Sequence, residues 1–206
     1  LYTKVVQIVA TTLQVDVGDI SCTATRTDKV PNTSPTAASS GSDLNGMAAK
    51  QAAETLKHRL SEFAAKHFAV DTSAVQFASG HIHIGGHTLT FAELARLAYV
   101  NRVSLSAVGY YRTPKIHYDR SLARGRPFYY FAYGAAVSEV IVDTLTGEYK
   151  VHRVDICHDV GESLNPALDL GQIEGGFIQG MGWVTNEELV WDCLLYTSPS
   201  PRDSDS

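Results

Sequence analysis

Residues 31–46 form a polar segment that is rich in hydroxyl-bearing, small and turn-forming residues and lacks Lys and Arg. Directly after it, residues 47–68 have the apolar periodicity of a long amphipathic helix, and Ser40 and Asp43 have capping-box spacing. A loop leading into a helix N-terminus offers free backbone N–H groups and the positive end of the helix dipole. It can hold a phosphate or another anion without cationic side chains. The alternative is a surface linker ending in a helix cap, which composition alone favours.

Charge and composition exclude several classes of protein. The net charge of −5 argues against nucleic acid as a partner, because phosphate backbones are held by clustered Lys and Arg. No apolar run approaches the roughly 18 residues that a membrane span needs. The chain opens without an initiator Met or a signal peptide, so we expect an internal fragment of a longer protein. Three distant cysteines without a CxxC pair predict a reduced, cytoplasmic protein: Cys22, Cys157 and Cys193.

The hydrophobic pattern predicts an α+β fold of antiparallel sheets with packed helices, in two lobes at about residues 1–102 and 103–192. Residues 193–206 lack any period and are rich in Ser, Pro and Asp, so they are expected to be a disordered or non-native tail. The expected helices cover residues 3–15, 47–68, 91–102 and 165–182. The expected strands cover residues 20–27, 75–78, 81–84, 87–90, 104–111, 128–143, 148–159 and 183–191.

Three histidines lie close together in the expected hairpins. His81 and His83 share one strand face, and His87 follows a tight turn at Gly85 and Gly86. Imidazoles at this spacing could hold a metal ion, but no Asp, Glu or Cys accompanies them at ligand spacing. The sequence therefore favours an edge hairpin with solvated histidines.

The expected helix at residues 165–182 carries five glycines, and each interior glycine costs roughly 1 kcal/mol of helix stability relative to Ala. This many glycines predict the close approach of another backbone or of a flat ligand. Gln172 and Gln179 project from nearly the same face, and a ligand rich in ring nitrogens and oxygens would satisfy their amides. The alternative is a glycine-faced helix that simply packs on a sheet. The glycines are Gly171, Gly175, Gly176, Gly180 and Gly182.

Three long stretches together, residues 29–46, 110–114 and 159–182, resemble one family closely. This family is the xanthine dehydrogenase/oxidase group of molybdenum hydroxylases, and the resemblance is to the molybdopterin-binding large subunit of the bacterial type. It covers residues 1–192. The resemblance implies part of a two-lobed molybdopterin-binding domain.

The resemblance also implies an activity and a set of partners. Enzymes of this family hydroxylate hypoxanthine to xanthine and xanthine to urate, with water as the oxygen source. Electrons leave through iron–sulfur clusters and FAD, on other domains or subunits, to NAD. The implied partners are a purine substrate and an iron–sulfur/FAD subunit in a heteromeric oligomer.

Cofactor-binding residues follow from the matching motifs. The family's Ala-Ala-Ser segment, the residues after it, and the Gln of a Phe-Ile-Gln-Gly sequence contact the molybdopterin. The residue matching Ala38 lies nearest the molybdenum, although it supplies no side-chain ligand. The implied cofactor-binding residues here are Ala37, Ala38, Ser39, Ser40, Gly41, Ser42, Asp43 and Gln179.

Several functional residues of the family have no match in this chain. A Gly-Gln-Gly pterin contact and the substrate-clamping residues would precede Leu1. The catalytic Glu of a Gly-Glu-Pro-Pro segment would lie beyond the point where the chain turns into its Ser/Pro-rich tail. We therefore assign no catalytic residue and expect the chain alone to be inactive. Without the substrate residues, aldehyde oxidase and carbon monoxide dehydrogenase remain alternatives, as does a non-catalytic binding module.

Overall fold

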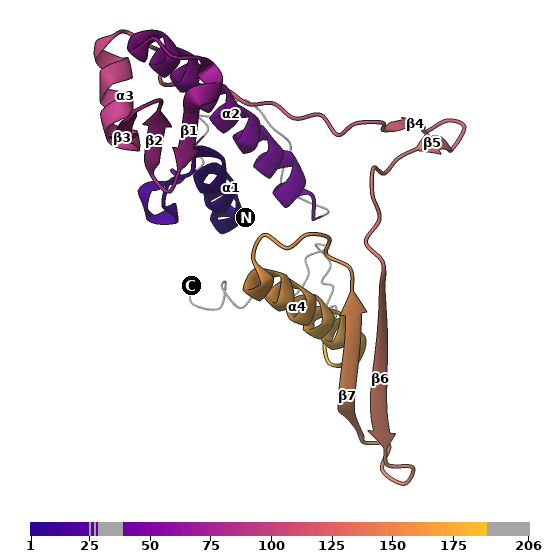
Figure 1. Cartoon of the computed structure of the whole chain (residues 1–206). Coiled ribbons are helices and arrows are strands. Elements are labelled where there is room, and N and C mark those ends of the chain that lie inside the picture. Colours follow the sequence, from indigo (N-terminus) through magenta and orange to yellow (C-terminus); the bar gives the residue numbers. More distant parts are fainter. Residues whose placement is uncertain (25, 27, 29–38, 189–206) are drawn as a thin grey trace. The chain divides into compact units, whose positions relative to one another are not determined.

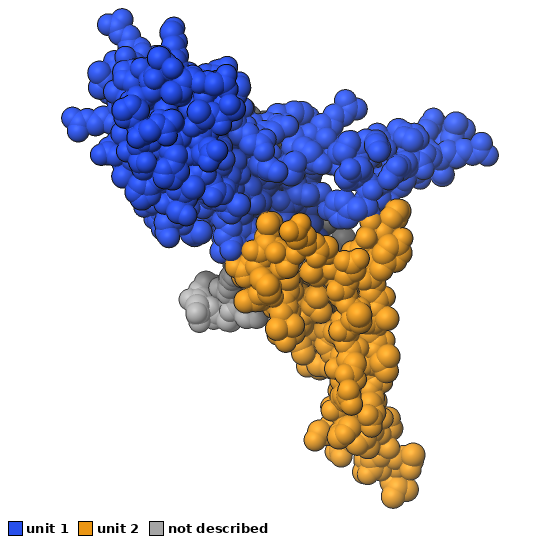
Figure 2. Space-filling model, viewed as in Figure 1, with its two compact units in different colours: residues 1–130 blue, residues 131–206 orange. Residues whose placement is uncertain are grey.

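The computed structural model describes residues 1–24, 26, 28 and 39–188, and its helices and antiparallel sheets confirm the predicted α+β class (Figure 1). The chain divides into two compact units, residues 1–130 and 131–206 (Figure 2). The two lobes expected at residues 1–102 and 103–192 stay a prediction. The expected tail at 193–206 lies outside the described residues. No helix among the described residues is both long and apolar enough to cross a membrane.

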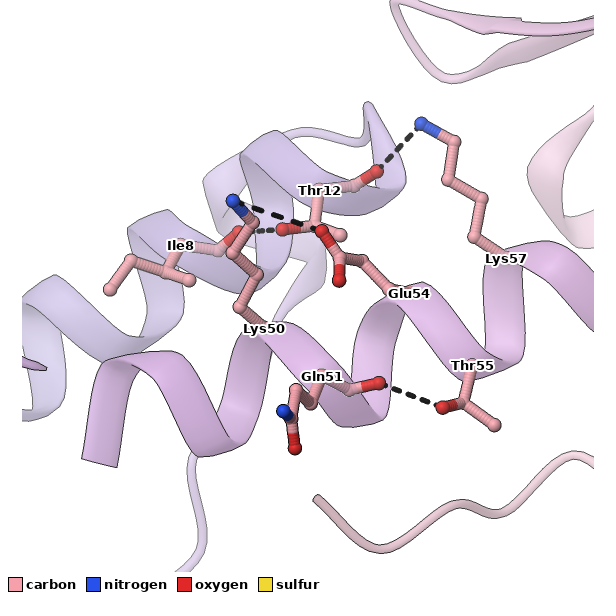
Figure 3. Close-up of polar contacts among 7 residues, drawn as sticks. All are labelled: Ile8, Thr12, Lys50, Gln51, Glu54, Thr55 and Lys57. Carbon is pink, nitrogen blue, oxygen red and sulfur yellow. Dashed lines mark hydrogen bonds and ion pairs between the residues drawn. The ribbon is translucent and has the colours of Figure 1, made fainter. Parts of the chain in front are cut away.

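Two helices, α1 (Tyr2–Leu13) and α2 (Gly41–Phe68), pack against each other in the first unit. Both were expected from their apolar periodicity. The Nζ atom of Lys57 in α2 donates a hydrogen bond to the carbonyl oxygen of Thr12 in α1 at 2.9 Å, as Figure 3 shows. The hydrogen bond joins the C-terminal end of α1, where backbone carbonyls lack intrahelical partners, to the middle of α2.

Helix α2 begins at Gly41, six residues earlier than residue 47, where the periodicity predicts its start. Residues 41–46 include Gly, Ser and Asn, which are weak helix formers. Packing outweighs this preference, because Gly46 is buried against α1 and a Cβ added there would lie 2.6 Å from Cδ1 of Ile8. Contact with another helix therefore extends α2 beyond what propensity alone predicts.

A short 3-10 helix, η1 (Val17–Asp19), follows α1, and the Asp16 side chain caps it by accepting a hydrogen bond from the Gly18 amide. The strand expected at residues 20–27 is wrong for its described residues, which form no strand. Alternating residues favour a strand, but a strand also needs a neighbour to pair with.

The three-stranded sheet of the first unit confirms the strands predicted at residues 75–90. Its strands β1 (Val75–Ala78), β2 (His81–Ile84) and β3 (His87–Thr90) pair antiparallel in that order. The β2–β3 turn requires a glycine because Gly85 has a positive φ of 57°. A second short 3-10 helix, η2 (Thr72–Ala74), precedes β1.

Helix α3 (Phe91–Val100) starts with the capping box that Thr90 and Glu93 predict. The Glu93 amide donates to Oγ1 of Thr90 at 3.2 Å, and Oε2 of Glu93 accepts from the Thr90 amide at 2.8 Å. The hydrogen bonds from Thr90 lower the pKa of Glu93. The sheet, α2 and α3 enclose the core of the unit, which consists of Leu60, Ala64, Ile82, Ile84, Leu94 and Ala98.

After α3, the expected strand at residues 104–111 is wrong, because these residues belong to no sheet. Further along, β4 (His117–Asp119) and β5 (Arg124–Arg126) form a small antiparallel ribbon. The aromatic cluster at residues 128–133 is exposed, although aromatic clusters more often pack in a core.

The second unit contains a two-stranded antiparallel sheet and one helix. Strands β6 (Gly134–Val142) and β7 (Tyr149–His158) confirm most of the predicted hairpin, with a register shift between Glu139 and Val140. Residues 128–133, which were expected to begin the first strand, are not part of it.

Helix α4 (Pro166–Thr185) confirms the predicted glycine-rich helix. Pro166 occupies its first turn, and the Asn165 side chain accepts a hydrogen bond from the Leu168 amide at 3.2 Å. The strand expected at residues 183–191 is wrong, because residues 183–185 continue the helix and residues 186–188 form no strand. Residues 189–191 lie outside the described residues.

The second unit exposes much of its apolar surface. No residue of α4 is buried. The exposed large apolar side chains of this unit include Val137, Ile141, Tyr149, Ile178 and Trp183.

Candidate functional site

The described part of the predicted cofactor loop lies at the N-terminal end of α2. Ala37 and Ala38 lie outside the described residues. Ser39 has a positive φ of 54°, an uncommon backbone conformation for a residue other than glycine, and Ser40 is the N-cap of the helix. Gly41, Ser42 and Asp43 form the first helical turn. The loop therefore delivers its last residues directly into a helix N-terminus, as the sequence predicts.

The capping box expected between Ser40 and Asp43 is wrong. The Ser40 side chain makes no capping hydrogen bond to the helix. The Asp43 carboxylate accepts a hydrogen bond from the Leu44 amide at 2.7 Å instead, through Oδ1. The positive φ of Ser39 and the bridge-like backbone of Ser40, at φ −95° and ψ 1°, depart from the extended N-cap geometry on which a capping box depends.

The first turn of α2 has the donor groups that an anion needs. The Leu44 amide is bonded to the Ser40 carbonyl oxygen at 3.0 Å. Within the described part of the chain, the backbone N–H groups of Gly41, Ser42 and Asp43 have no hydrogen-bond partner. Three unpaired N–H groups at the positive end of a helix dipole suit a phosphate or a polar heterocycle. The chemistry of these donors therefore fits a phosphate-bearing pterin.

Residues 103–111 lie along α2 and lead toward this turn. Nη1 of Arg59 in α2 donates hydrogen bonds to the carbonyl oxygens of Ser104 at 2.7 Å and Ser106 at 3.0 Å. Nearer the start of α2, Oε1 of Gln51 accepts a hydrogen bond from the Tyr110 amide at 3.3 Å. Residues 104–111 were expected to form a strand. Side chains of α2, and not a neighbouring strand, form hydrogen bonds with their backbone groups.

One tyrosine from later in the chain contacts the first turn of α2. The Tyr130 hydroxyl donates a hydrogen bond to Oδ2 of Asp43 at 2.8 Å. This hydrogen bond raises the pKa of Tyr130, with smaller contributions from burial and from the nearby Asp43 and Tyr111 side chains. The structure therefore brings the 39–43 loop end together with Tyr130. Sequence reasoning missed Tyr130, because the only signal was its place in an aromatic cluster, and such clusters more often pack in a core.

Gln179, the remaining predicted site residue, lies on α4 in the second unit. Its side chain is exposed and has no hydrogen-bond partner among the described residues. Cβ atoms added at Gly175, Gly176 or Gly180 would meet nothing within 4 Å, so this part of α4 has room for a flat group. Gln179 and the 39–43 loop belong to different compact units. A cofactor site that they share therefore stays a prediction.

Helix α4 forms an open groove of about 370 Å³ with the β6–β7 sheet. Its lining is mostly apolar and does not include Gln179; the lining residues are Ser138, Val151, Gly176, Phe177, Gly180, Met181 and Val184. The open space at Gly176 and Gly180 thus lies on the sheet side of α4, and neither a flat ligand nor close packing on the sheet is decided by it.

The histidines at residues 81, 83 and 87 are exposed, as the sequence favours. The expected edge position is wrong for two of them, because β2 is the central strand of its sheet and its Ile82 and Ile84 are buried in the core. Nδ1 of His81 is 3.1 Å from the Ser79 carbonyl oxygen, and Nδ1 of His83 is 3.1 Å from Oγ1 of Thr88. Across the residues that the structure covers, no three His, Cys, Asp or Glu side chains form a group that could hold a metal ion.

Comparisons with known proteins agree on one family. Residues 1–200 match the molybdopterin cofactor-binding domain family, and this match extends into the segment expected to be a tail. Xanthine dehydrogenase of Oryza sativa subsp. japonica is 44% identical over 191 residues, which cover 93% of this chain and 13% of that protein. Xanthine dehydrogenase/oxidase of Mus musculus is 45% identical over 189 residues, covering 92% of this chain and 13% of that protein. The chain thus spans 13% of the length of these curated relatives.

Solved structures show the same fold. The quinoline 2-oxidoreductase from Pseudomonas putida 86 matches with a TM-score of 0.74 and 22% identity, over 96% of this chain and 25% of that chain. A reconstituted CO dehydrogenase from Oligotropha carboxidovorans matches with a TM-score of 0.75 and 25% identity, over 92% of this chain and 23% of that chain. With the family match over residues 1–200, these likenesses lead to one conclusion: the chain belongs to the molybdopterin cofactor-binding domain family of xanthine dehydrogenase-type molybdenum hydroxylases.

Proposed function

We propose that this chain is the cofactor-holding part of an enzyme that hydroxylates hypoxanthine and xanthine. The observation that carries the proposal is 44% identity to a xanthine dehydrogenase over 93% of the chain. The unpaired donors at the start of α2 support it, because they lie where the resemblance places the cofactor loop. Water supplies the oxygen atom, and electrons pass through iron–sulfur clusters and FAD elsewhere in the enzyme to NAD. We place this enzyme in the cytoplasm.

In this proposal the chain binds and orients the cofactor. The N–H groups of Gly41, Ser42 and Asp43 donate hydrogen bonds to the cofactor's oxygen atoms, and the helix dipole favours its negative charge. The Gln179 amide can both donate to and accept from ring atoms of a pterin. When bound, the molybdenum cofactor supplies the redox centre that accepts electrons from the substrate. The resemblance implies that Ala38, a small residue of the same loop, would lie nearest the molybdenum.

The isolated 206-residue chain is expected to show no hydroxylation of hypoxanthine or xanthine. We assign it no general base, and proton abstraction by a positioned base contributes typically about 10²–10⁴-fold to a rate. The test is a urate assay of the purified chain supplied with cofactor, with the complete enzyme as the positive control. Urate formation by the chain alone would show that it contains the catalytic machinery and would contradict this assignment.

Replacing Gln179 by Ala in the complete enzyme should lower its molybdenum content per protomer by about threefold to tenfold. The expected loss is that of one hydrogen-bonding side chain, about 1 kcal/mol. Molybdenum can be measured by elemental analysis after gel filtration. The matched control is Glu174→Ala, which removes an exposed side chain from a different face of the same helix, five residues away. Equal molybdenum content in the two variants would remove Gln179 from the cofactor-binding residues.

A second candidate is a molybdenum hydroxylase for another substrate, such as carbon monoxide or an aldehyde. The structural likeness to CO dehydrogenase, with a TM-score of 0.75, supports this second candidate. Measuring kcat/KM of the complete enzyme for xanthine, carbon monoxide and an aromatic aldehyde separates the candidates. We expect xanthine to be preferred, because the identity to xanthine dehydrogenases is much higher than the 25% identity to CO dehydrogenase.

A further inference from the structure

We propose that Tyr130 is a positioning residue for the cofactor, acting through Asp43 on the first turn of α2. The inference rests on the proposed cofactor-binding function of that turn. Tyr130 is the last residue of the first unit and lies outside every motif that carries the resemblance. Its hydroxyl is nevertheless hydrogen-bonded to the loop end, across 87 residues of sequence.

The Asp43 carboxylate is held at both oxygens. Oδ1 accepts from the Leu44 amide at 2.7 Å, and Oδ2 accepts from the Tyr130 hydroxyl at 2.8 Å. Hydrogen bonds to an ionised carboxylate are stronger than bonds between neutral groups. A tyrosine hydroxyl, with an ordinary pKa of about 10, is protonated at neutral pH and can donate this hydrogen bond, which raises the pKa of Tyr130 further. The carboxylate therefore has a fixed orientation in the folded chain.

This orientation matters because Asp43 belongs to the turn that offers free donors. The N–H groups of Gly41, Ser42 and Asp43 are unpaired within the described residues, and a carboxylate is a strong acceptor for such groups. Without Tyr130, Oδ2 of Asp43 is free to turn toward these N–H groups. The carboxylate then competes with an anionic cofactor for the same donors and repels its charge. Tyr130 thus keeps an acidic side chain from blocking the site in which it lies.

The mechanism predicts a specific pattern of variants. In the complete enzyme, Tyr130→Phe should speed the loss of molybdenum and pterin during dialysis roughly 10-fold, the effect of one hydrogen bond to a charged group. In an Asp43→Asn background, where no carboxylate competes, adding Tyr130→Phe should change the loss rate less than about twofold. Such coupling is what a double-mutant cycle isolates.

The matched control is Tyr129→Phe, which removes a neighbouring hydroxyl that has no hydrogen-bond partner among the described residues and keeps the aromatic ring. It should lose cofactor at the wild-type rate. The thermal midpoint of the cofactor-free enzyme should be the same for both single variants within about 1 °C, because the Tyr130 hydroxyl is exposed. A lower midpoint for Tyr130→Phe alone would indicate a general structural role and overturn the proposal.

The remaining outcomes separate this inference from the function on which it rests. If the wild-type enzyme holds the cofactor and Tyr130→Phe loses it as slowly as Tyr129→Phe does, the positioning role is wrong and the cofactor function stands. Equal effects of Tyr130→Phe in the wild-type and Asp43→Asn backgrounds would also overturn it, because the effect would not pass through the carboxylate. If the wild-type enzyme contains neither molybdenum nor pterin, the proposed function itself fails.

Discussion

Replacing Gly109 by Ala is expected to destabilise the first unit by about 2–3 kcal/mol, the usual cost of overpacking at a site that cannot relax. A Cβ at Gly109 would overlap with the carbonyl oxygen of Ala48 and lie 2.8 Å from the backbone nitrogen of Ala52. Both atoms belong to the backbone of α2, so no rotamer change relieves the overlap. The residues that lie along α2 must move away, and the hydrogen bond from Tyr110 to Gln51 breaks. Thermal or urea unfolding measures the loss.

The matched control is Gly86→Ala. A Cβ at Gly86 would meet nothing within 4 Å, and Gly86 is not among the residues with positive φ. We therefore expect a change of less than about 0.5 kcal/mol, as for ordinary surface substitutions. Hydrogen exchange at the Tyr110 amide should become faster in Gly109→Ala only. Equal stability and equal exchange in both variants would mean that residues 103–111 do not pack on α2 in solution.

Replacing Ala38 by Phe in the complete enzyme should lower kcat/KM for xanthine by at least about 100-fold, because small displacements of a reacting group can cost that much. The resemblance places Ala38 nearest the molybdenum and the substrate, where a phenyl ring would fill the space that the purine needs. Molybdenum content should fall much less than activity. The measurement is steady-state urate formation, normalised to bound molybdenum.

Ala38→Gly serves as the control for this substitution, because it changes the backbone but adds no volume. It should keep more than about half of the activity per molybdenum. Full activity of Ala38→Phe would show that residue 38 does not border the substrate. An equal loss in both variants would mean that backbone conformation matters at this position and bulk does not.

Local signals in the sequence predicted much of the fold. The strands at residues 75–90 were bounded correctly, because a Gly-Gly turn and alternating residues fix both the hairpin and its register. Thr90 with Glu93 gave the start of α3, and Asn165 with Pro166 gave the start of α4. In each of these places the residues that decide the structure lie within a few positions of one another.

Errors arose where distant contacts decide the structure. Residues 104–111 have the composition of a strand, but Arg59 and Gln51 of α2 take the hydrogen bonds that a partner strand would take. Residues 20–24 also lack a partner strand, and packing against Ile8 extends α2 back to Gly41. No local pattern contains these contacts.

The candidate site combines local and distant features in the same way. The end of the predicted cofactor loop lies at a helix N-terminus because the polar segment and the helix periodicity are adjacent in the sequence. Tyr130 could not be assigned to Asp43, since 87 residues separate them and the neighbouring residues of Tyr130 are also aromatic. The glycines of α4 predicted the close approach of another backbone or of a flat ligand, which stays a prediction, because Cβ atoms added at Gly175, Gly176 and Gly180 would meet nothing within 4 Å among the described residues.

We propose that residues 39–43 and Gln179 bind the cofactor in an enzyme that holds molybdopterin. The most direct test is the molybdenum and pterin content of the complete enzyme, purified without added cofactor, by elemental analysis and by fluorescence of the oxidised pterin. We predict close to one molybdenum and one pterin per protomer. The absence of both from a folded, full-length enzyme produced in cells that make the cofactor would contradict the claim and favour a non-catalytic binding module.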